Sequence, residues 1–362
     1  MRGGGGGANL LALRSHNTAL VLDLLRTAGA DGISRLELAE RTGLTPQAVS
    51  KITARLREDG LAAEAGRRAS TGGKPRTVLR LVPEAGHAVG VHLDRDEVRV
   101  VLVDLRGTVV GERRAALDLG GGAGAVLGAV REAVAEVLPD GFDGALLGAG
   151  VALPGPLDHA RGVLHRVTGF PKWDGFPLRE ALRGRLGVPV VVDKDTNAAA
   201  LGLAAGGEGG SFAYLHLGTG LGAGLVIGGS VHRGARTGAG EFGHQVIQLD
   251  GPPCTCGDRG CVEALCLGAV ARGDLEEAAR VLGAGAANLV GLLDIDVVLL
   301  GGRTVRAAPE AFVRGVAAVL AERARRTGQD AVPVRVAPGD GRTVAVGAAQ
   351  LVLGPVFGRG GG

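Results

Sequence analysis

The segment GEFGHQVIQLDGPPCTCGDRGCVEA (240–264) constrains the fold more than any other part of the sequence. Nine residues separate His244 from Cys254, one separates Cys254 from Cys256, and four separate Cys256 from Cys261. Three thiolates and one imidazole complete a tetrahedral zinc shell and leave no open position for catalysis. The spacing therefore predicts a structural zinc site that folds this loop, with small buried cysteines lacking a metal as the alternative.

The composition is that of a globular chain with few aromatic residues. Hydrophobic residues make up 46% of the 362 residues and charged residues 21%, which is enough to bury a sizeable core. The aromatic content of 2% argues against a protein whose main task is to stack bases. No run of 18 apolar residues occurs, and the N-terminus lacks a signal-peptide core. We expect a soluble cytoplasmic protein without a membrane partner, and a disordered glycine-rich tail over residues 1–14.

Positive charge is concentrated at the front of the chain. Residues 1–82 hold 13 Lys and Arg against 7 Asp and Glu, whereas the remainder holds 27 against 30. A small basic module joined to a slightly acidic body suggests that the front module meets a polyanion. Most of the basic residues are arginine, which a GC-rich genome also favours, so the arginine bias itself decides nothing.

Residues 15–82 have the pattern of a winged helix-turn-helix. Apolar residues recur at helical spacing over 17–26. Ser34 with Glu37 forms a capping box that begins a second helix, and Thr45 caps a third helix. Two short strands, 61–65 and 77–82, then flank a Gly- and Arg-rich loop that would be the wing. A plain three-helix packing unit is the alternative.

The outer face of the third helix and the wing supply the candidate DNA contacts. A helix-turn-helix places the N-terminal residues of this helix nearest the bases in the major groove. Gln47 could contact adenine, while Lys51 and Arg55 could contact guanine or phosphate. Basic wing residues could follow the backbone or enter a narrow minor groove. The predicted DNA-binding residues are Thr45, Gln47, Ser50, Lys51, Arg55, Arg67, Arg68, Lys74 and Arg76.

The rest of the chain alternates strand-like and helical patterns in two blocks, which predicts an α/β body of two lobes. The expected strands are 89–93, 98–105, 145–153, 188–193, 212–218, 223–229 and 297–302, and the expected helices are 123–138, 178–186, 196–205, 274–293 and 308–327.

These motifs resemble the ROK family (repressors, open reading frames and kinases) in its regulator form. The resemblance rests on PGPLD (154–158), VDKDTNAAALG (192–202), LGTGLGAGL (217–225) and the 240–264 segment, and it covers nearly the whole chain. It implies a winged helix-turn-helix, mostly α-helical, followed by an actin-like, sugar-kinase-like body. The expected division is 15–82 for the DNA-binding domain, 83–196 plus about 340–357 for the first lobe, and 197–339 for the second lobe with its zinc loop.

The resemblance also implies a sugar site beside the zinc loop. In the family, the matching positions bind sugar hydroxyls or the metal. The implied ligand-binding residues are Asp195, Asn197, Glu241, His244 and Glu263, and the implied zinc ligands are His244, Cys254, Cys256 and Cys261. His244 would bind zinc through one nitrogen and a hydroxyl through the other. Taken alone, Asp195 could equally be a helix cap.

Three positions depart from the family pattern. Kinase members carry Asp-x-Gly-Gly-Thr in the first hairpin, where bare backbone approaches ATP; here His92 replaces the Asp, Asp94 and Arg95 the glycines, and Asp96 the Thr. Carboxylates and side chains in that turn would repel phosphates. Thr168-Gly169-Phe170 replaces an expected pocket Asn before Trp173. The helical segment after Cys266 is also shorter than usual, which bears on oligomer contacts.

We therefore expect a DNA-binding transcriptional regulator, a repressor, that responds to a sugar or sugar derivative and has no catalytic residues or kinase activity. Its partners would be a double-stranded operator and a sugar effector, and it would form a homodimer or higher homo-oligomer. Two alternatives stay open. One is a glucokinase-like sugar kinase with a fused DNA-binding module, and the other is a DNA-binding regulator that no longer responds to a ligand.

Overall fold

The front module is a three-helix unit with a three-stranded sheet. The computed structural model describes residues 16–359 except 71–72, 166, 168–169 and 340, so the predicted tail over 1–14 lies outside the described residues. Ser34 accepts a hydrogen bond from the Glu37 amide, and Glu37 accepts one from the Ser34 amide, which confirms the capping box. The elements are α1 (His16–Thr27), β1 (Ile33–Ser34), α2 (Arg35–Thr42), α3 (Pro46–Glu58), β2 (Ala62–Ser70) and β3 (Gly73–Leu81), with strand order β1-β3-β2.

The wing strands are longer than the sequence predicts. Strand β2 continues to Ser70 and β3 begins at Gly73, where we expected a loop over 66–76. Arg67 pairs with Thr77 and Arg68 with Arg76 across the antiparallel ladder. A hairpin that projects into solvent needs no apolar alternation, because its backbone hydrogen bonds hold it and both of its faces can be polar. Reasoning from hydrophobic pattern therefore ended the strands too early.

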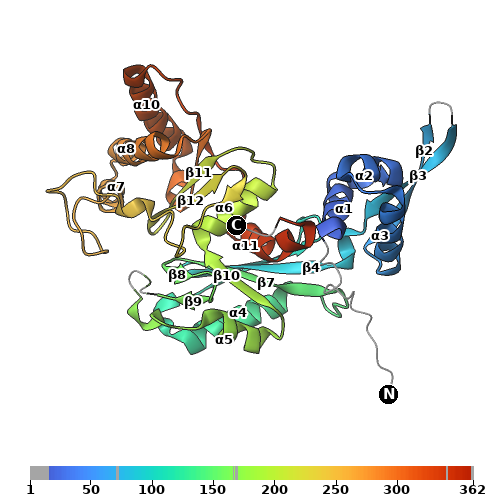
Figure 1. Cartoon of the computed structure of the whole chain (residues 1–362). Coiled ribbons are helices and arrows are strands. Elements are labelled where there is room, and N and C mark those ends of the chain that lie inside the picture. The colour runs from blue at the N-terminus through green and yellow to red at the C-terminus, as the bar shows by residue number, and fades with distance from the viewer. Residues whose placement is uncertain (1–15, 71–72, 166, 168–169, 340, 360–362) are drawn as a thin grey trace.

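The first lobe is built on a five-stranded mixed sheet with strand order β10-β7-β4-β5-β6. Helices α4 and α5 cover one face, and their apolar side chains form one core with the sheet. Helix α11 covers the other face (Figure 1). The elements are β4 (His87–Leu93), β5 (Glu97–Asp104), β6 (Val109–Ala116), α4 (Ala123–Val137), β7 (Leu146–Leu153), α5 (Leu178–Leu186), β10 (Val190–Lys194) and α11 (Thr343–Leu353), with a small hairpin of β8 (Leu157–Asp158) and β9 (Val163–Leu164).

The second lobe repeats this plan around a sheet with strand order β13-β12-β11-β14-β15. Helices α7, α8 and α10 share one apolar core with the sheet, and α6 packs on the other face. Its elements are α6 (Asp195–Ala205), β11 (Phe212–Leu217), β12 (Leu221–Ile227), β13 (Ser230–Val231), α7 (Val262–Ala271), α8 (Leu275–Leu293), β14 (Val297–Gly301), α9 (Arg303–Ala307), α10 (Pro309–Thr327) and β15 (Val334–Val336).

Helix α11 fits between the first-lobe sheet and α6 because glycines line both contacts. A Cβ atom on Gly150 would lie 1.7 Å from the carbonyl oxygen of Ala348, and one on Gly347 would lie 1.7 Å from that of Ala198. No side chain fits at such distances, so the backbones meet directly. The last helix of the chain is thus fixed against both lobes.

The front module packs on the first lobe through the C-terminal segment. One apolar core runs from α1 through the sheet to α11 and the short helix η7 (Gly354–Phe357). The Arg26 guanidinium lies 5.1 Å from the centre of the Phe357 ring, and Arg359 pairs with Asp23 at 3.1 Å. The position of α1 is therefore linked to the end of the chain (Figure 1).

Candidate functional site

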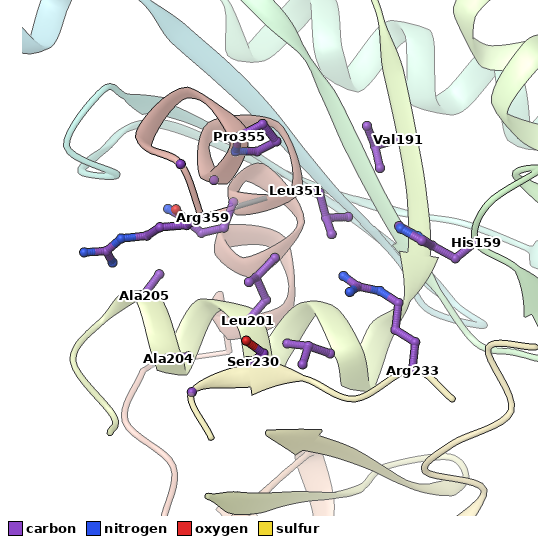
Figure 2. Close-up of a pocket in the computed structure, with 15 residues that line it drawn as sticks. His159, Val191, Leu201, Ala204, Ala205, Ser230, Arg233, Leu351, Pro355 and Arg359 are labelled. Atoms are coloured by element: carbon purple, nitrogen blue, oxygen red, sulfur yellow. The ribbon is translucent and has the colours of Figure 1, made fainter. Parts of the chain in front are cut away.

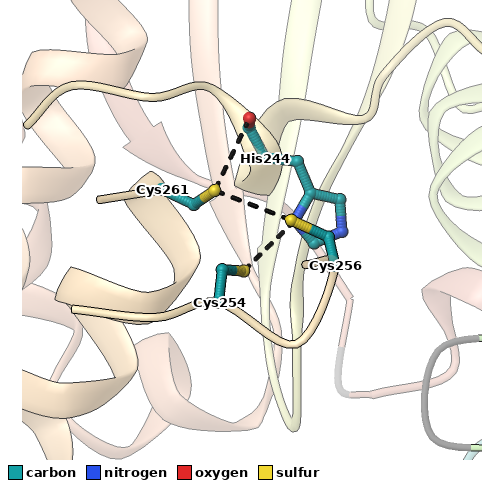
Figure 3. A group of neighbouring side chains, drawn as sticks. All are labelled: His244, Cys254, Cys256 and Cys261. Carbon is teal, nitrogen blue, oxygen red and sulfur yellow. Dashed lines mark hydrogen bonds between the residues drawn. The ribbon is translucent and has the colours of Figure 1, made fainter. Parts of the chain in front are cut away.

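The His244, Cys254, Cys256 and Cys261 side chains converge in one place (Figure 3). Their ligand atoms all lie within 4.8 Å of one another. His244 Nδ1 is 3.6 Å from Cys254 Sγ, and the Sγ atoms of Cys256 and Cys261 are 3.7 Å apart. Ligands about 2.3 Å from a tetrahedral zinc ion would be about 3.7 Å apart, so the four residues fit a metal ion of this kind.

The loop is shaped to hold these four side chains. Cys254 donates a backbone hydrogen bond to the Asp258 carbonyl, which closes the turn that carries Cys256. Gly260 has φ +66°, and a Cβ atom there would meet the Gln248 carbonyl oxygen at 1.6 Å. Burial, followed by the neighbouring thiols, raises the pKa of Cys261 to about 12. A cation is therefore needed to hold this cysteine as a thiolate at neutral pH.

A small polar cavity of about 100 Å³ lies beside the metal cluster, between the two lobes. Four of the five predicted ligand-binding residues line it: Asp195, Glu241, His244 and Glu263. They come from the start of α6, the loop after β13, the short helix η6 (Phe242–His244) and the first turn of α7. His244 thus belongs both to the metal cluster and to the cavity wall, so a metal ion would orient a ligand-facing ring.

Backbone contacts fix two of these carboxylates. Glu263 accepts a hydrogen bond from the Leu221 amide at 2.7 Å, which joins α7 to the turn between β11 and β12. Asp195 accepts one from the Thr196 amide at 2.7 Å, while the residue also lines the cavity. Its carboxylate is therefore placed both to contact the first turn of α6 and to face a ligand.

Asn197 lies beneath the cavity and does not line it. The residue is fully buried, and its Nδ2 donates to Asp193 Oδ1 at 2.9 Å. Its Oδ1 atom has no hydrogen-bond partner among the described residues. Asn197 is therefore the predicted ligand-binding residue that is absent from the described cavity lining, and its side chain instead contacts Asp193.

Lys194 is a cavity residue that the sequence reasoning missed. Only 3% of its side chain is exposed, and Nζ donates to Glu241 Oε1 at 3.0 Å and to the Ala239 carbonyl. It immediately precedes Asp195 at the carboxyl end of β10, where a site residue is expected in an α/β sheet. This position at the end of a predicted strand was the signal that could have identified Lys194. The ion pair occupies hydrogen-bonding capacity of Glu241 that a sugar would otherwise use.

The turn between β4 and β5 forms an ion-pair cluster with the second lobe. Arg303 Nη2 donates to Asp94 Oδ2 at 2.7 Å and to Asp96 Oδ1 at 2.8 Å, and Nη1 donates to Asp96 Oδ2 at 3.0 Å. Burial alone would raise the pKa of Asp94, but its hydrogen bond from Arg303 lowers that pKa overall; the hydrogen bond from Arg303 also lowers the pKa of Asp96. Both carboxylates are charged at neutral pH. We name Asp94, Asp96 and Arg303 the interlobe clamp.

Two imidazoles, the buried His92 and the partly buried His216, lie near the clamp. Burial lowers the pKa values of His92 and His216, more than the nearby carboxylates raise them. His216 Nδ1 and the Tyr214 hydroxyl are 3.0 Å apart. Neutral imidazoles cannot compensate phosphate charge, so the positive charge on this side of the cleft comes from arginines. Three of them are in ion pairs, Arg303 in the clamp and Arg99 and Arg114 with Glu97, and Arg306 also lines the cavity.

The segment in which the family pattern has an Asn is described in part. Thr168 and Gly169 lie outside the described residues. The Phe170 ring lies 5.4 Å from the Arg95 guanidinium, and Trp173 donates its indole hydrogen bond to the Leu119 carbonyl at 2.9 Å. These contacts fix the aromatic residues against the first lobe, near the arginine that lines the cavity.

The outward face of α3 is exposed to solvent. Gln47, Ser50, Lys51 and Arg55 are exposed, whereas Val49, Thr53 and Leu56 face the core. The Thr45 side chain is also exposed and accepts a hydrogen bond from the Ala48 amide at 3.2 Å, so it caps α3. Arg76 is exposed on β3, while the side chains of Arg67, Arg68 and Lys74 lie outside the described part of the structure. Helix α3 and the hairpin of β2 and β3 lie on the side of the front module that faces away from the two lobes (Figure 1).

The fold and site define a winged helix-turn-helix module joined to a two-lobed, sugar-kinase-like body. The model of the ROK family matches residues 88–274, and a winged helix-turn-helix DNA-binding model matches residues 21–62. The chain belongs to the ROK family. In the described part of the chain, none of the helices combines the length and apolar character that crossing a membrane requires.

Known relatives include regulators and kinases. The chain is 27% identical to a putative xylose repressor from Caldicellulosiruptor sp. over 89% of this chain and 92% of that protein. It is 32% identical to the DNA-binding transcriptional dual regulator NagC of Escherichia coli over 71% of this chain and 64% of that protein. A ROK family transcriptional regulator structure, a homologue of the E. coli MLC protein, matches 96% of this chain and 98% of its own with a TM-score of 0.75 at 20% identity.

A kinase structure also matches the body. The ROK glucokinase from Streptomyces griseus, in complex with glucose and AMPPNP, covers 74% of this chain and 99% of its own with a TM-score of 0.63 at 27% identity. The body fold is thus common to both branches of the family, and the separate residues of each site must decide between binding and phosphoryl transfer.

Proposed function

We propose that this protein is a sequence-specific DNA-binding transcriptional repressor whose body senses a sugar or sugar derivative. The observation that carries the proposal is the exposed, basic face of α3 on a module that packs against a body with a polar interlobe cavity. Relatives with the names putative xylose repressor and N-acetylglucosamine repressor support it. The protein would bind a double-stranded operator as a homodimer or higher homo-oligomer, inside the cell.

Zinc is proposed as the metal of the His/Cys cluster, in a structural role. When bound, the ion would cross-link the loop and polarise the His244 ring. The described ligand set has four members, so no position is left for an activated water. The chain's own residues then do the recognition: Asp195, Glu241 and Glu263 accept hydrogen bonds from hydroxyls, and His244 orients them.

Sugar binding would reach the DNA-binding module through the first lobe. The cavity is formed by both lobes, and α1 is tied to the C-terminal segment by the contacts of Asp23 and Phe357. A ligand changes DNA affinity only by as much as it prefers one arrangement of the two modules, typically about 1–3 kcal/mol. The two sites would therefore show reciprocal coupling.

The interlobe clamp argues against a kinase role. The family resemblance implies that the β4–β5 turn would approach ATP in a kinase. Here Asp94 and Asp96 stand in that turn, and Arg303 ties both to the second lobe. Phosphoryl transfer depends on positioning and on positive charge that compensates the phosphates. The clamp has two carboxylates and one guanidinium, so its net charge is negative. We propose that the protein has no kinase activity. Zinc-loaded protein that phosphorylated a hexose with ATP would contradict this.

DNA recognition is tested by selecting duplexes from a random library and measuring affinity against salt. Lys51→Ala should weaken binding to all sequences and reduce the salt slope by about 1 if it contacts phosphate. Gln47→Ala should alter base preference by about 1–3 kcal/mol at one position. Glu310→Ala, an exposed change on α10 of the body, is the matched control. If removal of residues 1–82 left operator binding intact, the assignment of the module would be wrong.

A regulator that no longer senses a ligand is the second candidate, and the Lys194–Glu241 ion pair favours it. The two are separated by a thermal-shift screen of sugars and sugar phosphates. If one sugar stabilises the protein and Glu241→Ala abolishes that stabilisation, the result supports sensing. If no sugar in a broad panel raises the melting temperature while DNA binding is retained, the result supports the unresponsive regulator.

A further inference from the structure

Arg95 places a guanidinium in the wall of the sugar cavity. The residue lies in the turn between β4 and β5. Its amide donates to Asp94 Oδ1 at 2.8 Å, and its carbonyl oxygen accepts a hydrogen bond from the Leu119 amide at 3.1 Å. Its guanidinium lies 5.4 Å from the centre of the Phe170 ring. Backbone hydrogen bonds and an aromatic ring therefore position this side chain before a ligand arrives.

The Arg95 side chain has no acceptor within the described part of the protein. Its Nε atom is buried and has no hydrogen-bond partner there, and the guanidinium forms no ion pair with a described carboxylate. The lining ammonium of Lys194, by contrast, is already bonded to Glu241 and to the Ala239 carbonyl. Arg95 is thus a lining cation whose charge no described carboxylate binds.

The arginines that line the larger cavity at the other end of α6 are used differently. That cavity has a volume of about 580 Å³, and Arg233 and Arg359 reach it from different sides (Figure 2). Arg233 pairs with Asp193 at 2.8 Å, and Arg359 pairs with Asp23 at 3.1 Å. These two guanidinium groups connect parts of the protein to one another, whereas that of Arg95 remains available to a ligand.

The carboxylates of the sugar cavity need a donor of this kind beside them. Asp195, Glu241 and Glu263 accept hydrogen bonds, whereas each sugar hydroxyl both donates and accepts. A Cβ atom on Gly220 would lie 3.1 Å from Glu263 Oε2 and 3.9 Å from Arg95 Nη2. An acceptor and a donor therefore border the same side of the cavity, where the glycine leaves room for a ligand oxygen.

The charges of the lining disfavour an anionic ligand. Two of the four described lining carboxylates are paired with a cation. The pairs are Glu241 with Lys194 and Asp94 with Arg303. The other two carboxylates, Asp195 and Glu263, outnumber the guanidinium of Arg95. A phosphate or carboxylate on the ligand would add negative charge to this set, whereas a neutral sugar adds none.

We propose that Arg95 is a ligand-binding residue of the sugar cavity and that the ligand is a neutral, unphosphorylated sugar. The Arg95 guanidinium donates to the sugar oxygen beside Gly220, and Glu263 accepts the hydrogen of that hydroxyl. A ligand that lacks this oxygen leaves both groups without a partner, so Arg95 determines specificity. This role rests on the proposed sugar response of the body.

The chemical class is tested with neutral sugars and their charged counterparts on the full-length, zinc-loaded protein. The neutral probes are D-glucose, D-xylose and N-acetyl-D-glucosamine. The charged probes are D-glucuronate, D-glucose 6-phosphate and N-acetyl-D-glucosamine 6-phosphate. Calorimetry should show at least one neutral sugar that binds about tenfold or more tightly than its charged counterparts. Tighter binding of a charged probe than of its neutral parent would overturn the proposal.

Variants of Arg95 test the residue itself. Arg95→Ala should weaken binding of the neutral sugar about tenfold or more, as expected for a lost hydrogen bond from a charged donor. Arg95→Lys should recover part of this loss, because it keeps the charge without the planar fork. Arg131→Ala, an exposed change on α4 outside the cavity lining, is the matched control and should bind the sugar like the wild type. Thermal unfolding without sugar shows whether each variant folds, and Arg95→Gln replaces Arg95→Ala if the latter does not.

Monodeoxy analogues of the bound sugar separate a direct contact from a structural role. Removal of the hydroxyl that Arg95 contacts should weaken binding to the wild type about as much as Arg95→Ala does, and should weaken binding to that variant no further. Removal of the other hydroxyls should weaken binding to both proteins alike. If every hydroxyl contributed equally to both proteins, the direct contact would be wrong.

Failure of this role and failure of the proposed function give different results. Unchanged sugar affinity in Arg95→Ala overturns the role of Arg95 and leaves the sugar response intact. If the wild type binds its operator but none of the six probes at millimolar concentrations, the neutral-sugar assignment is overturned and the unresponsive regulator is supported instead.

Discussion

The charged groups on the two sides of the interlobe cleft have different surroundings. Beside the metal cluster, Asp195, Glu241, His244 and Glu263 border an open cavity. Around the β4–β5 turn, Asp94 and Asp96 are bound to Arg303. Glu241 pairs with Lys194 but keeps 44% of its side chain exposed, whereas Asp94 keeps only 21% exposed beside the Arg303 guanidinium. The comparison teaches that the same fold can keep one side for recognition and use the other to hold its lobes together.

Removal of the metal should have the largest effect, because it tests whether the recognition side depends on the cluster. Cys261→Ser should lose bound zinc and lower the free energy of unfolding by more than about 4 kcal/mol. Metal content and urea denaturation measure this. Cys266→Ala, a buried cysteine outside the cluster, is the control and should keep full metal content. Unchanged stability after complete chelation would show that the loop folds without a metal.

The Lys194–Glu241 pair tests how tightly the recognition side is held in the free protein. Glu241→Gln leaves a nearly buried ammonium without its carboxylate and should cost about 2 kcal/mol, less than a fully buried pair because Glu241 is half-exposed. Lys194→Met leaves the carboxylate accessible to water and should cost under about 1 kcal/mol. Thermal unfolding of both variants measures the asymmetry. A larger loss from Lys194→Met would mean that the lysine stem, not the charge pair, stabilises this cavity.

Breaking the interlobe clamp should have a smaller effect on stability. Arg303→Ala should lower the free energy of unfolding by about 1 kcal/mol, since Arg303 and Asp96 are largely exposed and salt screens them. The loss should shrink at high salt. Arg303→Lys keeps the charge without the planar fork and serves as the control. ATP binding that emerged in Arg303→Ala would show that the clamp alone excludes the nucleotide.

The smallest effect concerns pH, through the buried His92. Its pKa is lowered in the folded state, so below about pH 6.5 the unfolded chain takes up a proton that the folded chain refuses. Stability should therefore fall as pH drops from 7.5 to 5.5, and His92→Gln should show a shallower slope over the same window. Urea midpoints at several pH values measure this. Parallel slopes for the two proteins would mean that His92 titrates alike when folded and unfolded.

Much of the fold could be predicted from local sequence. The capping box at Ser34 and the Pro46 start of α3 are short-range signals, and the structure has the front helices where they indicate. The convergence of His244, Cys254, Cys256 and Cys261 could be predicted because the four residues lie within one short segment. The sequence did not predict strand β6 or helix α11. Strand β6 is an exposed edge strand with two arginines, so it lacks apolar alternation. Helix α11 consists largely of small residues and has no clear apolar face.

The cavity residues were only partly predictable because spacing does not give side-chain direction. Lys194 and Asn197 lie three residues apart in the sequence but belong to different elements. Lys194 is the last residue of β10 and lines the cleft cavity. Asn197 lies in the first turn of α6 and contacts Asp193. The clamp joins residues more than two hundred positions apart. No local pattern identifies such a pair, and only the packing of two lobes brings it together.

The position of α11 also has a consequence for synthesis. It covers one face of the first-lobe sheet, where Val101 and Val103 share a core with Ala345 and Ala349. While the ribosome is still making the body, that face stays uncovered until α11, which follows every strand of both sheets along the chain, has been translated. The front module is translated well before α11, because its elements precede all those of the body. Until α11 is translated, a nascent chain therefore carries a translated winged helix-turn-helix module on a first lobe whose sheet can be covered on one face only.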